Sequence, residues 1–144
     1  MDQIENSTQL FSQGYNCSQS VFAACAPQLG LPEETALKIG APFGAGIGYL
    51  GLTCGAVSGG LLVIGLKFGF SDPMQKEAKQ NTYRLAREFI QQFSARWGST
   101  RCKDLIGYDL MDPLSLESAR ASKIFDTTCP NFVRFAVELV NSLA

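Results

Sequence analysis

Cysteine thiols are the side chains of this 144-residue chain that offer the widest choice of chemistry. A thiolate can attack a disulfide or an oxidant, and several thiolates together can bind a metal ion. The chain has five cysteines and no histidine, which excludes Ser-His-Asp triads, Cys-His pairs and histidine-bound metals. No C-x-x-C spacing occurs, so the usual zinc-knuckle and thioredoxin motifs are absent. Any site shared by the cysteines must therefore be assembled by the fold.

Three of the cysteines directly follow a residue type that commonly caps the N-terminus of a helix. The three pairs are Asn16-Cys17, Thr53-Cys54 and Thr128-Cys129. Backbone N–H groups and the helix dipole favour negative charge at a helix start, so a lowered thiol pKa is expected there. Cys102 lies between Arg101 and Lys103, whose charges also favour a thiolate. Cys17, Cys54, Cys102 and Cys129 are therefore the candidate catalytic residues.

Cys25 differs from these four because it lies in an apolar run near an expected helix end. This position is typical of a small core residue. Cysteine is often buried without any function, and all five thiols could be inert in this way. Three helix starts among five cysteines favour a shared functional site over that interpretation.

The stretch from residue 40 to residue 69 is rich in glycine and carries one charge, at Lys67. We expect a buried central helix from Cys54 to about Phe68, with Thr53 as its N-cap. Gly55 and Gly59 would give this helix a face that a neighbouring helix can approach closely. The stretch is long enough to span a bilayer. Pro42 and the glycines before Thr53 would break such a helix, so no membrane span is expected.

Capping residues, prolines and glycines predict several more helices. We expect them at residues 4–13, 17–26, 31–40, 71–97 and 112–123, and from residue 127 to the C-terminus. Residues 98–113 read as irregular, and Tyr49 and Trp97 as core aromatics. Strand-like alternation is nearly absent, which predicts an all-α fold. We expect residues 1–144 to form a single-domain multihelical bundle around the Gly-rich central helix.

The charge balance gives no sign of a highly charged partner. The formal net charge is -1, and the basic residues between 76 and 96 lie off an apolar helical stripe. They are expected to form a solvated face rather than a nucleic-acid site. The N-terminal residues MDQIEN are polar and acidic, unlike a secretory signal, so we expect a cytoplasmic protein. Thiols are normally reduced in that compartment.

Three phrases of the sequence resemble a known family. They are YNCSQSV at residues 15–21, GAGIG at residues 44–48 and CGAVSG at residues 54–59. The family is described as putative redox-active proteins (C_GCAxxG_C_C), small domains with four characteristic cysteines. The resemblance extends from Cys17 to Cys129, makes Cys102 the third cysteine of the pattern and leaves Cys25 outside it. It implies a redox role and does not name a substrate.

Two functions are compatible with four clustered cysteines. In the first, a thiol–disulfide oxidoreductase, Cys54 attacks as the thiolate and Cys17 is the preferred partner, although four cysteines allow three pairings. The redox partner would be a protein or a small thiol or disulfide. In the alternative, the same cysteines hold an iron–sulfur cluster or another metal for electron transfer. Neither cofactor nor oligomeric state is assigned by the sequence, and a Gly-rich helix could also serve a homo-oligomer interface.

A third hypothesis concerns the glycine loop rather than the thiols. Backbone N–H groups at the start of the central helix could bind phosphate or another small anion. The loop lacks the Gly-Lys-Ser/Thr of a P-loop, and no strand precedes it as in a dinucleotide-binding motif. The glycines are better explained as positions where the backbone passes close to the cysteines.

Overall fold

The structure is a computed structural model that describes residues 2–143, and it is all-α as predicted. Its helices are, in chain order, α1 (Gln3–Ser12), α2 (Cys17–Cys25), η1 (Ala26–Leu29), α3 (Glu33–Gly40), η2 (Ala41–Phe43), α4 (Gly44–Ile47), α5 (Gly55–Phe68), α6 (Lys76–Trp97), α7 (Cys102–Ile106), α8 (Pro113–Ser122), α9 (Ile124–Thr127) and α10 (Cys129–Ser142). Within these residues no helix is both long and apolar enough to cross a membrane.

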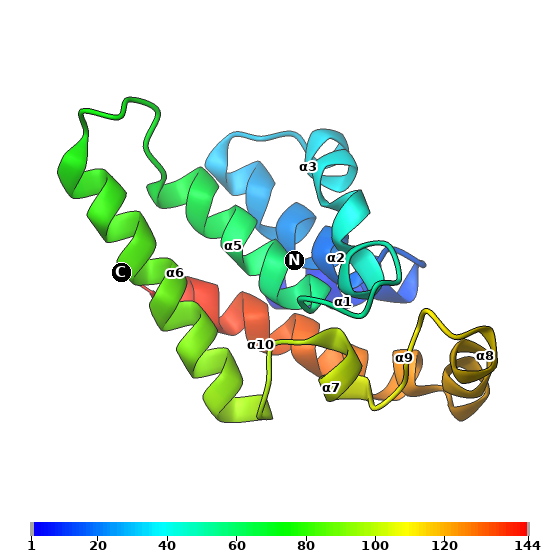
Figure 1. The fold of residues 1–144 in the computed structure, drawn as a ribbon. Helices are drawn as coiled ribbons and strands as arrows, with labels where there is room; N and C mark the ends of the chain where they lie inside the picture. The colour runs from blue at the N-terminus through cyan, green and yellow to red at the C-terminus, as the bar shows by residue number, and fades with distance from the viewer. Residues whose placement is uncertain (1, 144) are drawn as a thin grey trace.

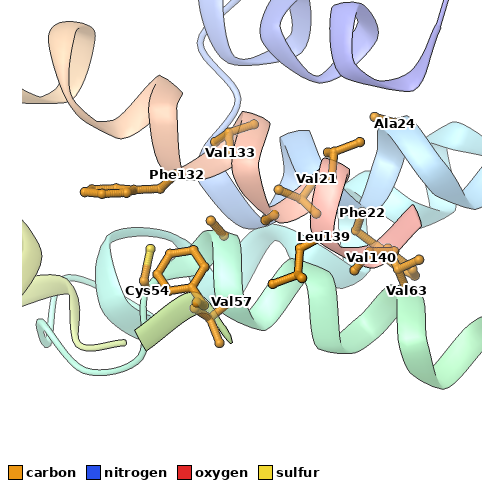
Figure 2. Packing of buried hydrophobic residues seen from close by; sticks show 14 of the residues in the cluster. Val21, Phe22, Ala24, Cys54, Val57, Val63, Phe132, Val133, Leu139 and Val140 are labelled. Atoms are coloured by element: carbon orange, nitrogen blue, oxygen red, sulfur yellow. The ribbon is translucent and has the colours of Figure 1, made fainter. Parts of the chain in front are cut away.

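Helix α5 lies at the centre of the arrangement (Figure 1) and packs against α2, α6 and α10. Its first half is buried, whereas its last turn reaches the surface, with Leu66 37% exposed. Apolar side chains from α2, α5 and α10 meet in the core between them (Figure 2). The N-terminal ends of α5 and α10, which carry Cys54 and Cys129, are thereby held on the same side of the core.

Two glycines of α5 set how closely α2 can approach. A Cβ at Gly55 would lie 3.0 Å from the Cys17 Cβ, and one at Gly59 would lie 2.9 Å from the Ser18 carbonyl oxygen. On another side, a Cβ at Gly60 would overlap the Phe89 ring of α6. Glycine is costly in a helix interior, by about 1 kcal/mol relative to alanine. Here that cost is offset by close helix packing.

The glycine loop before α5 has an unusual backbone. Residues 45–49 all have positive φ angles, including the non-glycine residues Ala45, Ile47 and Tyr49. They form a short left-handed turn, which costs roughly 1–2 kcal/mol for each residue that has a Cβ. Glycine is required at position 46, where a Cβ would lie 2.6 Å from the Leu52 nitrogen. The sequence predicted a glycine loop before the central helix, and in the structure this loop contains a left-handed turn.

Candidate functional site

The four candidate cysteines line one cavity of about 280 Å³, at the point where four helices begin. Cys17, Cys102 and Cys129 are the first residues of α2, α7 and α10, and Cys54 is the N-cap of α5. Three thiols are buried, with Cys54 4%, Cys102 8% and Cys129 6% exposed, while Cys17 is half-buried. Cys25 does not line the cavity, because it lies at the other end of α2 and is packed in the core.

Cys17 is positioned by the predicted cap of α2. The Asn16 side chain accepts a hydrogen bond from the Gln19 backbone N–H at 2.9 Å, and the Gln19 side chain accepts one from Asn16 N–H at 3.0 Å. This reciprocal capping box fixes the first turn of α2. The Asn16 amide also donates to the Ala41 carbonyl at 3.0 Å, which ties the turn to the glycine-rich segment.

Cys54 and Cys102 are held together by a short pairing of two chain segments. The Cys54 N–H donates to the Thr100 carbonyl at 2.7 Å, and the Cys102 N–H donates to the Leu52 carbonyl at 2.6 Å. Between them, Thr53 and Arg101 form an isolated antiparallel bridge. The predicted N-cap was wrong: Thr53 is used in this bridge, so the helix begins one residue later, with Cys54 as the cap.

The pKa values of Cys54 and Cys102 move in the opposite direction from the one predicted. Burial raises the pKa of Cys54 to about 11 and outweighs the backbone N–H groups of Ala56 and Val57, which lower it. Burial also raises the pKa of Cys102 to about 12. Arg101 and Lys103 are exposed, and neither contributes to that pKa. Loss of solvation therefore decides the protonation of both thiols, and they are neutral at pH 7.

Cys17 and Cys129 behave as a pair. The largest influence on each pKa is the other side chain: Cys17, acting as a hydrogen-bond donor, lowers the pKa of Cys129, and Cys129 raises that of Cys17 well above its ordinary value. Burial of Cys129 and the negative charge of Asp126 act against this lowering. Among the four thiols, Cys129 is therefore the one whose thiolate the surroundings favour.

The sequence pattern of a protein family, described as Putative redox-active protein (C_GCAxxG_C_C), matches residues 15–143. The chain belongs to this family. Comparison of the chain with curated proteins and with solved structures gave no match. The resemblance stated from the sequence motifs is thereby confirmed, and the matched region contains all four cavity cysteines.

Binding of a single zinc ion by these cysteines requires three or more ligands around one point. Within residues 2–143, no three Cys, Asp or Glu side chains are arranged so that they could hold one metal ion. The described cysteines also form no disulfide. In this arrangement the thiols of the described residues do not form the ligand set of a single zinc ion.

The rest of the cavity wall includes residues that the sequence did not identify. Arg120 from α8 and Asp126 from α9 both line it, although nothing in their sequence context marks them. Aromatic residues also contribute to the wall, among them Phe11, Tyr15 and Phe132. Tyr49 also lines the cavity, and it is 47% exposed rather than a core residue as predicted.

Proposed function

We propose that this protein carries out thiol–disulfide exchange, with Cys129 as the attacking thiolate and Cys17 as its partner. The observation that carries the proposal is that Cys17 and Cys129 line one cavity and that Cys17 lowers the pKa of Cys129. It supports a thiolate at Cys129 with a second sulfur in the same cavity. Both are needed for a disulfide to form and break.

The reaction proceeds in two exchange steps. The Cys129 thiolate attacks one sulfur of an oxidised substrate, so that a mixed disulfide forms and one substrate thiolate leaves. Cys17 then loses its proton, attacks the Cys129 sulfur and releases the second half of the substrate. Two protein thiols are oxidised to one disulfide, and the substrate disulfide is reduced to two thiols. In the cytoplasm, where we place the protein, a cellular thiol would reverse the protein's oxidation.

Cys54 and Cys102 act as a second, protonated dithiol at the same cavity. Their backbones are joined through the hydrogen bonds at Thr100 and Leu52. Their raised pKa values make them slow to attack an oxidant directly. We propose that they exchange with a Cys17–Cys129 disulfide after it has formed, so that all four cysteines take part.

The test begins with anaerobic purification, followed by metal analysis, an absorption spectrum and mass-spectrometric disulfide mapping before and after mild oxidation. We expect thiols to be lost in pairs, Cys17–Cys129 to be the first disulfide, and dithiothreitol to restore both thiols. Cys129→Ser should slow oxidation by roughly 100-fold, because the favoured thiolate is gone. Cys25→Ser is the matched control and should react at the wild-type rate.

Two results would contradict this function. Bound iron with visible absorption, lost in Cys54→Ser or Cys129→Ser, would assign the cysteines to a cluster. Five thiols that all stay reduced under mild oxidation would make them structural.

A further inference from the structure

The position of the thiols limits what can react with them. Cys54, Cys102 and Cys129 are each less than a tenth exposed, and the cavity they line measures about 280 Å³. A disulfide in another folded protein is carried on bulky backbone and cannot enter a space of this size. Small-molecule sites begin at about 300 Å³, which is close to the volume found here. The burial of Cys129, which attacks in the proposed reaction, and the cavity volume therefore favour a small molecule as the reactant.

We infer that the substrate is a low-molecular-weight disulfide with an apolar, preferably aromatic, body and an anionic group, rather than a disulfide of another protein. This inference rests on the proposed thiol–disulfide exchange. The aromatic wall supports the apolar body, since rings from separate elements surround the thiols. These aromatic residues are Phe11, Tyr15, Tyr49, Phe125 and Phe132.

The anionic group is inferred from Arg120. Arg120 lines the cavity from α8, is exposed, and has no ion pair with a residue between 2 and 143. A free guanidinium can hold a carboxylate through two parallel hydrogen bonds. Asp126 lines the same cavity, and its negative charge acts on Cys129. Because Asp126 would repel an anion, we place the anionic group of the substrate at Arg120 and the substrate disulfide at Cys129.

The chemistry balances without any further reagent. The Cys129 thiolate attacks the substrate disulfide, and the first substrate thiolate takes a proton from solvent. Cys17 attacks the Cys129 sulfur, and its proton goes to the second substrate thiolate. One substrate disulfide becomes two thiols, and one Cys17–Cys129 disulfide is formed.

The experiment follows oxidation of the reduced full-length protein by three disulfides in stopped flow. The probes are 5,5′-dithiobis(2-nitrobenzoate), an aromatic disulfide with two carboxylates; 2,2′-dithiodipyridine, which is aromatic and uncharged; and oxidised thioredoxin as a protein disulfide. We expect saturable oxidation by the two small probes and oxidation by thioredoxin at least about 100-fold slower. Arg120→Gln should reduce kcat/KM about tenfold for the dicarboxylate and less than twofold for the uncharged probe.

Controls separate this inference from the proposed function. Arg87→Gln removes an exposed arginine of α6 that does not line the cavity, and it should leave all three rates unchanged. Disulfide mapping then reports which bond has formed. If a Cys17–Cys129 disulfide forms as fast with thioredoxin, or Arg120→Gln affects both small probes equally, the substrate class is wrong and the exchange function stands. If no disulfide forms with any probe, both are overturned.

Discussion

The reactivity of each thiol depends on two opposing local effects, burial and hydrogen bonding. All four cavity cysteines lie at helix starts, yet only Cys129 has a lowered pKa. For Cys54 the loss of water outweighs the nearby backbone N–H groups, whereas Cys129 gains a hydrogen bond from a second thiol. A helix start is therefore not sufficient to ionise a buried cysteine, and a direct donor to the sulfur decides the outcome.

Removing the Cys17 thiol should raise the pKa of Cys129. Cys17→Ala removes the interaction that lowers the pKa of Cys129, so this pKa should rise and the thiolate fraction of Cys129 at a pH below it should fall. The pH dependence of Cys129 alkylation by iodoacetamide, followed by mass spectrometry, measures this. Cys17→Ser keeps a hydroxyl donor and should give a smaller shift. An unchanged alkylation profile in Cys17→Ala would show that the thiol pair does not interact.

At the scale of the elements, the contact between α2 and α5 determines where the cysteines lie. Gly55 touches the Cys17 Cβ, and Gly59 lies against the backbone of Ser18. The glycine face predicted from the sequence is thus used to bring the start of α2 next to the start of α5. A wider spacing would move Cys17 away from both Cys54 and Cys129.

Two substitutions in α5 separate helix propensity from this packing. In Gly59→Ala the new Cβ would lie 2.9 Å from the Ser18 carbonyl oxygen, so we expect a loss of about 1–3 kcal/mol in the free energy of unfolding. Gly65→Ala places its Cβ in open space within the same helix and should stabilise the protein by about 0.5–1 kcal/mol. Urea denaturation of both variants measures these changes. Equal effects at the two positions would refute the packing argument.

At the scale of the whole molecule, the fold gathers helix starts that are far apart in the sequence. Cys17, Cys54, Cys102 and Cys129 come from four different helices and share one cavity. The same packing buries Cys25 away from that cavity, with only 1% of the residue exposed. Burial therefore keeps one cysteine protonated and unreactive while the fold collects the other four.

The raised pKa of the Cys25 thiol should lower the free energy of unfolding at high pH. Burial raises its pKa from an ordinary value of 9.0 to about 12. Above pH 9 the unfolded chain loses this proton while the folded chain keeps it, so folding stability falls as pH rises towards 12. The loss is about 1.4 kcal/mol per pH unit, and below pH 9 the contribution is fully present.

Urea denaturation at about pH 8 and about pH 10.5, roughly one unit below and one and a half units above the ordinary pKa of 9.0, tests this sign. The wild type should lose about 2 kcal/mol more stability between the two conditions than Cys25→Ala does, since the other titrating groups are common to both proteins. Identical losses would show that the Cys25 thiol ionises as readily in the folded chain as in the unfolded one.

The sequence by itself determined the longer helices and that Cys17 and Cys129 begin two of them, because caps, prolines and glycines act over a few neighbouring residues. The prediction that residues 98–113 are irregular was wrong, since Cys102 begins the short helix α7 there. The Asn16 cap and the glycine face of α5 were predicted in this way, and the motifs around Cys17 and Cys54 identified the family. Only the tertiary structure decided which thiol has a lowered pKa and which charged residues line the cavity. Burial of Cys54, the hydrogen bond from Cys17 to Cys129 and the placement of Arg120 all depend on contacts between distant segments, which local patterns do not specify.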